Sequence, residues 1–65
     1  MGWLEWKYQI DATNNEFDRK EISREIYESR IKTYICMIYR CGNEDAARGY
    51  AKAHSYRLED LLEHF

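Results

Sequence analysis

Proline is absent from the 65-residue sequence, which has only three glycines. It contains no proline- or glycine-rich stretch, no low-complexity tract and no internal repeat. These absences exclude a linker between domains, and a chain of this length has room for one domain, residues 1–65. So short a chain builds a marginal core and often needs a further stabilising partner.

Cysteine is also scarce. Cys36 and Cys41 are five positions apart in a predicted helix, roughly 140° apart around its axis, so a disulfide between them is not expected. No Cys-x-x-Cys pair and no zinc-ligand spacing is present. We therefore expect no metal and no cofactor. Two unpaired thiols favour a reducing compartment, which predicts a cytoplasmic protein.

Long apolar runs, strong charge and catalytic motifs are missing too. The longest apolar run, residues 34–39, is too short to span a membrane. The net charge of −2, from 12 acidic and 10 basic residues, disfavours nucleic-acid binding. There is no phosphate-binding loop and no nucleophile with a recognisable base. We expect a protein that is not an enzyme.

Aromatic residues are abundant, with two Trp, six Tyr and two Phe. Trp3, Trp6 and Tyr8 lie in an N-terminal aromatic segment, residues 1–12, whose apolar and polar residues alternate. This alternation favours a short strand or extended segment. Trp3, Trp6 and Ile10 also have helical spacing, so a short helix is the alternative. A strand here would have no second strand in the chain to pair with.

A long helix is predicted over residues 16–41. Thr13 with Glu16, or Asn15, could cap its start, and Gly42 marks its end. A helical hairpin is predicted over residues 44–65, with Asn43 and Ser55 as caps and an apolar face on its second helix formed by Leu58, Leu61, Leu62 and Phe65. The expected fold class is therefore mainly α, either a small α or an α+β domain.

The long helix would carry two apolar stripes. The first has the four-three spacing of packed helices, with Ile35 beside it, and consists of Tyr27, Ile31, Tyr34, Ile38 and Cys41. The second lies about 120° away and consists of Ile22, Ile26 and Met37. Either both stripes pack inside one molecule, or one stripe meets another protein.

A partner-binding interpretation therefore involves two groups of residues. Aromatic anchors and the second stripe would bind a larger protein through Trp3, Trp6, Tyr8, Ile22, Ile26 and Met37. The first stripe would be a homodimer seam formed by Tyr27, Ile31, Tyr34 and Ile38. The competing interpretation places all these side chains in a small core.

Short chains of mixed charge, many aromatics and no catalytic motif are typical in style of phage or mobile-element proteins. Such proteins dock on host machinery, including bacterial defence complexes. No motif links this sequence to a particular family. From this general likeness, the expected function is that of a protein-binding inhibitor or accessory protein.

The alternative is a small dimeric DNA-binding regulator. Residues 47–64 could form a helix-turn-helix, but its second helix would present Glu59, Asp60 and Glu63 to phosphates. A ribbon-helix-helix dimer would instead use the N-terminal strand. The basic residues available for nucleic acid are Lys7, Arg19, Lys20 and Arg24.

Overall fold

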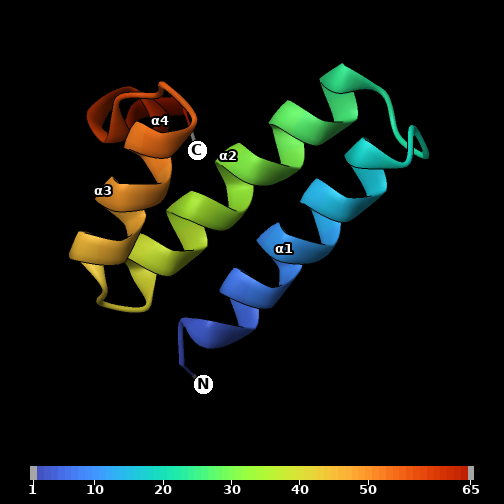
Figure 1. Ribbon diagram of the computed structural model, residues 1–65. Coiled ribbons are helices and arrows are strands. Elements are labelled where there is room, and N and C mark those ends of the chain that lie inside the picture. Colours follow the sequence, from blue (N-terminus) through green and yellow to red (C-terminus); the bar gives the residue numbers. More distant parts are fainter. Residues whose placement is uncertain (1, 65) are drawn as a thin grey trace.

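The computed structural model describes residues 2–64, which form four helices. Their bounds are α1 Leu4–Asp18, α2 Arg24–Arg40, α3 Glu44–Ala53 and α4 Leu58–His64. Figure 1 shows α1 and α2 as an antiparallel pair, with α3 and α4 beside the other flank of α2. The prediction of a mainly helical chain is confirmed. Within residues 2–64 there is no strand.

The predicted N-terminal strand was wrong, because residues 4–18 form the single helix α1. Its inward residues follow a three-four spacing that places them against α2: Trp3, Trp6, Ile10, Thr13 and Phe17. A period of two and a period near 3.6 both fit the first ten residues. The helical period wins because it continues through Thr13 and Phe17 and buries one face against a second helix.

The predicted long helix over residues 16–41 was also wrong, because residues 19–23 break it into α1 and α2. Lys20 has a φ of 61°, a left-handed conformation that cannot continue a helix. Ser23 then caps α2, and its hydroxyl accepts a hydrogen bond from the Ile26 amide at 3.2 Å. Thr13 and Asn15, the expected caps, lie inside α1.

The predicted C-terminal boundaries agree more closely with the structure. Gly42 has a φ of 93° directly after α2, and the Asn43 side chain caps α3 by accepting from the Ala46 amide. Helix α4 begins at Leu58 rather than directly after Ser55, whose φ of 64° places it in the turn. Leu58 and Leu61 of the predicted apolar face are buried, and Leu62 is half-buried. Phe65 lies outside the described residues.

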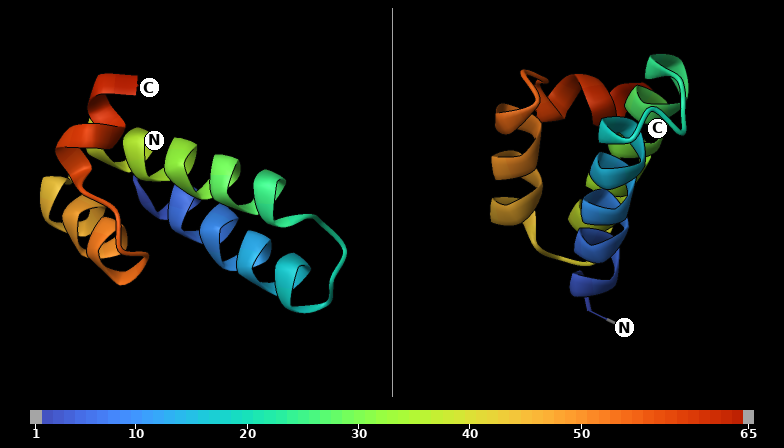
Figure 2. Two further views of the ribbon diagram at one scale, coloured as in Figure 1. Left: turned by 90° about the horizontal axis from the view of Figure 1, so that it is seen from above. Right: turned by 45° about the vertical axis from the view of Figure 1, so that its right-hand side comes forward.

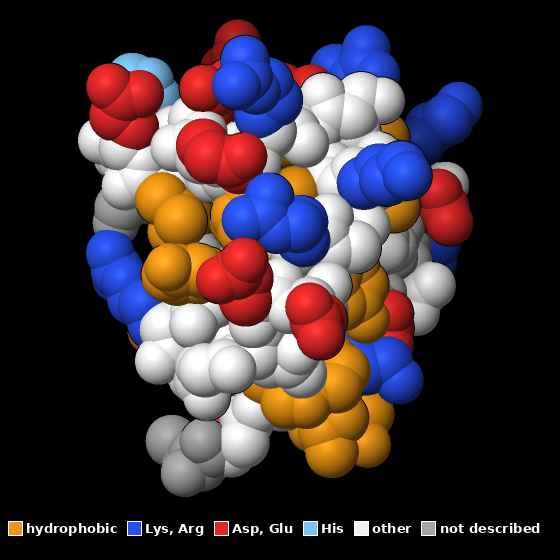
Figure 3. Space-filling model, turned by 90° about the vertical axis from the view of Figure 1, so that its left-hand side faces the viewer, with side chains coloured by type: hydrophobic (Ala, Val, Ile, Leu, Met, Phe, Trp, Pro, Cys, Tyr) orange, Lys and Arg blue, Asp and Glu red, His pale blue; other side chains and the backbone are white. Residues whose placement is uncertain are grey.

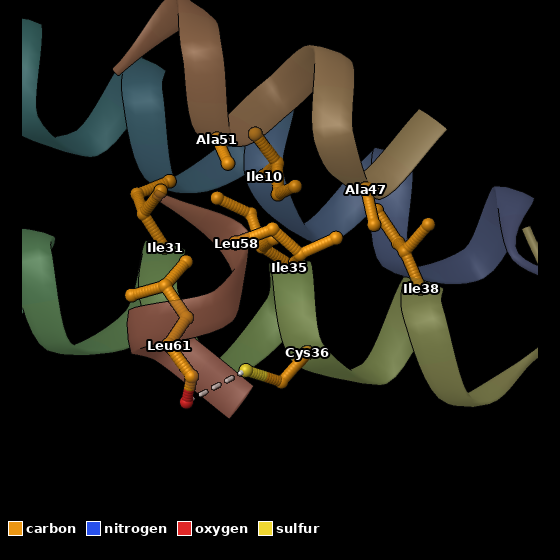
Figure 4. Packing of buried hydrophobic residues seen from close by; sticks show 9 residues of the cluster. All are labelled: Ile10, Ile31, Ile35, Cys36, Ile38, Ala47, Ala51, Leu58 and Leu61. Atoms are coloured by element: carbon orange, nitrogen blue, oxygen red, sulfur yellow. Dashed lines mark hydrogen bonds between the residues drawn. The ribbon is translucent and has the colours of Figure 1, made fainter. Parts of the chain in front are cut away.

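The core is built around α2. Figure 4 shows its members, contributed by all four helices: Ile10, Ile31, Ile35, Cys36, Ile38, Ala47, Ala51, Leu58 and Leu61. Small alanines on α3 let that helix approach the isoleucines of α2, and the Cys36 thiol donates to the Leu61 carbonyl oxygen at 3.6 Å. Among the described residues, the backbones of α1 and α3 do not come within 8 Å of each other. Helix α2 is therefore the element against which the other three pack (Figure 2).

Candidate interaction surface

The N-terminal tryptophans belong to the contact between α1 and α2. Both are half-buried and pack on the core, and the Trp6 ring stacks on Tyr34 with centroids 5.9 Å apart. At the other end of the same contact, Phe17 stacks on Tyr27 at 4.3 Å. Stacked aromatic pairs add to the free energy gained by burial alone. Trp3 and Trp6 thus line the interior side of α1, whereas Tyr8 does not.

The opposite side of α1 faces solvent. Leu4 and Tyr8 are 48% and 63% exposed, one helical turn apart, and the Lys7 ammonium lies 5.9 Å from the centre of the Tyr8 ring. Three exposed polar residues continue the row along the whole helix. We call this row the outer stripe, and it consists of Leu4, Tyr8, Asp11, Asn15 and Asp18.

The second predicted stripe occupies other parts of the surface. Ile26 is 45% exposed on α2. Met37, three turns further along the same helix, is half-buried, with the Arg40 guanidinium 3.9 Å from its sulfur. Ile22 is half-buried in the connection between α1 and α2. None of the three lies on α1, the helix that carries Tyr8.

The predicted dimer seam lies mostly inside the single chain. Ile31 and Ile38 have no exposed surface, and Tyr27 and Tyr34 are half-buried against Phe17 and Trp6. Side chains fully covered by their own chain have no area left for a second copy. The predicted seam is therefore wholly or partly covered within one molecule, whereas Cys41 of the first stripe is exposed.

A polar group ties three helices together above this core. The Tyr27 hydroxyl donates to Asn14 Oδ1 at 2.7 Å and lies 3.5 Å from His54 Nδ1. The His54 ring also stacks on Tyr56, with centroids 6.1 Å apart. Burial lowers the pKa of His54 below its ordinary 6.5 and raises the pKa of Tyr27. His54 at the end of α3 is a packed histidine, and its burial favours the neutral ring.

Three of the four basic residues proposed for nucleic acid lie at the connection between α1 and α2, and Lys7 is separate from them. Arg19 pairs with Glu21 at 2.9 Å, and Arg24 pairs with Glu28 at 3.9 Å. Lys20 lies in the turn after α1, and Lys7 lies near the N-terminal end of that helix. Arg19 and Arg24 each pair with a neighbouring glutamate, so acidic side chains accompany these cations on the surface.

The face formed by α3 and α4 carries both signs of charge, with an excess of acidic side chains. Arg48 on α3 pairs with Glu44 at 3.0 Å and reaches Glu59 on α4 at 3.2 Å. Figure 3 shows basic and acidic side chains intermixed over this side, with hydrophobic side chains gathered toward its lower right. Mixed charge of this kind is typical of a solvated surface.

A hollow of about 420 Å³ lies between α2 and the start of α4. The Lys32 ammonium lies 5.2 Å from the centre of the Tyr56 ring at its wall. The remaining lining residues are Ser55, Arg57, Asp60, Leu61 and His64. Asp60 and Arg57 are 4.0 Å apart and largely cancel each other's charge.

Residues 2–64 show no feature of a metal site, a disulfide or a membrane-spanning helix. No group of three or more His, Cys, Asp or Glu side chains there could hold a metal ion. No helix in that range is long and apolar enough to cross a membrane. Cys36 is buried and Cys41 is exposed, and neither forms a disulfide.

Sequence reasoning missed Leu4 and the contact of Asn14 with Tyr27. The signal for Leu4 was present, because residues 4, 8, 11, 15 and 18 share one side of any helix over this segment. The same segment also shows the alternating pattern of a strand, and in a strand residues 4, 8, 11, 15 and 18 would not share one side. The contact of Asn14 with Tyr27 depends on how α1 folds back on α2, which no local pattern specifies.

Comparison with protein-family models, with curated proteins and with solved structures finds no match for this chain.

Proposed function

We propose that this chain is a small, non-catalytic protein-binding module that docks on a larger protein through the outer face of α1. The observation that carries the proposal is the exposure of Leu4 and Tyr8, at 48% and 63%. Both lie on the side of α1 opposite Trp6 and Ile10, which pack on the core, so the described chain leaves them exposed. Tyrosine and neighbouring aliphatic groups bury a large area at low entropic cost when a partner covers them.

The narrower expectation of an inhibitor from a phage or mobile element, acting on a bacterial defence complex, remains a prediction from the style of the sequence. The DNA-binding alternative gains no specific support. Its ribbon-helix-helix form requires a strand that residues 2–64 do not contain. Its helix-turn-helix form would present Glu59, Asp60 and Glu63 of α4.

The test is affinity capture of the tagged protein from its native cell extract, with nuclease added, at low and high salt. We expect one stoichiometric protein that is retained by the wild type and lost by the Leu4→Ser, Tyr8→Ser double variant. Both positions are exposed, so this variant should keep its melting temperature. Tyr39→Ser, at an exposed tyrosine on α2, is the matched control and should retain the partner.

Trp3→Ala and Trp6→Ala serve as a second comparison. Because both rings pack on the core, we expect them to lower the melting temperature, in contrast to the exposed double variant. Capture that persists in the Leu4→Ser, Tyr8→Ser variant would contradict the proposed surface. Capture abolished by nuclease would overturn the proposal in favour of nucleic acid.

A further inference from the structure

The outer stripe is an exposed row along α1. Its members are spaced four, three, four and three residues apart, so they share one side of the helix. Over the 15 residues of α1 the stripe extends about 21 Å. Helix α1 packs on α2 through its other side, with Trp6, Ile10 and Phe17. The described chain therefore covers the inner side of α1 and leaves the outer stripe exposed.

The outer stripe is also divided by chemistry. Leu4 and Tyr8 make its N-terminal half apolar, while Asp11 and Asp18 make its C-terminal half acidic. Neither aspartate forms an ion pair with any of residues 2–64. Elsewhere on α1, by contrast, Glu16 pairs with Arg30 of α2 at 2.9 Å.

Covering the outer stripe would remove two unpaired carboxylates from water. Such a loss of hydration is unfavourable unless the covering surface supplies cations or hydrogen-bond donors. A partner that covers Leu4 and Tyr8 alone would bury only the apolar half of the outer stripe. A partner that covers all of it must combine an apolar segment with lysine or arginine about two turns further along.

We propose that the partner element is a basic amphipathic helix that lies along α1. Its apolar side chains pack over Leu4 and Tyr8, and its lysines or arginines pair with Asp11 and Asp18. This inference rests on the proposed function and specifies the chemistry of the partner. A helix suits this surface because it can lie along the roughly 21 Å of the stripe and place apolar side chains at one end and basic side chains about two turns further along.

The probe is a synthetic helical peptide with leucine along one face and lysine beside it, together with a counterpart in which glutamate replaces every lysine. Binding is followed by amide chemical-shift changes in the intact chain. We expect the lysine peptide to bind and to shift the amides of α1. The Asp11→Lys, Asp18→Lys double variant should bind it about fivefold to tenfold more weakly and should gain affinity for the glutamate peptide.

The matched control reverses two acids outside the stripe, Glu25→Lys and Glu63→Lys, both exposed and without an ion pair among residues 2–64. It changes net charge by the same amount and should leave the lysine-peptide affinity within about twofold. Equal binding of both peptides, no binding of either, or shifts confined to other helices would overturn the inference.

Failure of this inference is separable from failure of the proposed function. A native protein that is lost by the Leu4→Ser, Tyr8→Ser variant but retained by Asp11→Lys, Asp18→Lys would keep the protein-binding module and overturn the basic helix. A native protein retained by both variants would overturn the proposed surface itself. Loss with both variants, together with peptide selectivity, supports both.

Discussion

The protonation state of His54 is linked to the packing of its neighbours. As a neutral ring it can donate from Nδ1 to the Tyr27 hydroxyl, which in turn donates to Asn14, so one hydrogen-bonded chain joins α3, α2 and α1. Burial lowers the pKa of His54, which means that the folded protein favours the neutral ring. The charged ring is the form that the unfolded chain accepts more readily.

Stability should therefore fall on acidification. The folded-state pKa is below the unfolded value of about 6.5, so the unfolded chain binds the proton first as the pH drops. We expect the free energy of unfolding to be highest above this value and to decrease below it. Denaturant unfolding of the wild type and of His54→Gln at several pH values measures this.

In the same experiment, the glutamine variant keeps a hydrogen-bonding side chain at position 54 and should show the shallower pH dependence. His64 is unchanged in both proteins, so the difference isolates His54. Identical pH profiles for the two proteins would contradict a neutral, packed His54.

At the scale of the element, prediction from sequence succeeded where a local signal marks a boundary. Gly42 and Asn43 end α2 and begin α3 through their own backbone and side-chain chemistry. The break at residues 19–23 contains neither glycine nor proline, and Lys20 adopts its left-handed conformation without a residue type that favours it. The apolar residues of the N-terminal segment fit both the period of a strand and the period of a helix. Only packing against α2 decides between the two structures.

Ser23→Ala distinguishes the observed break from an uninterrupted helix. Because Ser23 caps α2, its replacement should lower the free energy of unfolding by about 1 kcal/mol. In a continuous helix the same change would raise it by roughly 0.5 kcal/mol, since alanine is the better helix former. Ser29→Ala, inside α2, is the control and should be neutral or slightly stabilising. Chemical denaturation followed by circular dichroism gives both values.

At the scale of the whole molecule, the sequence reveals an apolar stripe on a helix. It does not reveal which element, of this chain or another, covers that stripe. Tyr27, Ile31, Tyr34 and Ile38 were recognised as one face, and the fold covers that face with α1 and α3 of the same chain. Of the residues predicted for a partner, Tyr8 and Ile26 are exposed, whereas Trp3 and Trp6 are packed inward. Which face remains open depends on the paths of all four helices, which helical spacing alone does not specify.

Ile31→Glu tests this assignment. Ile31 is completely buried, so a carboxylate there would lose its hydration without a partner, at a cost of several kcal/mol. That is comparable to the whole stability of a small domain, so we expect loss of cooperative unfolding and of helical circular dichroism. Ile26→Glu, at a side chain 45% exposed, should remain folded. If the wild type is a dimer and Ile31→Glu is a folded monomer, the result would instead support the dimer-seam interpretation.

The position of α2 has a consequence for how the chain folds and unfolds. Every other helix packs on α2, while the backbones of α1 and α3 stay apart within the described part of the chain. A fragment that lacks α2 would leave α1 without a helix to pack on, and α3 and α4 with only each other. A fragment that keeps α2 with one neighbour would expose the isoleucines on the other side of α2. No two-helix piece is self-sufficient, so the chain should cross a single barrier between its unfolded and folded states.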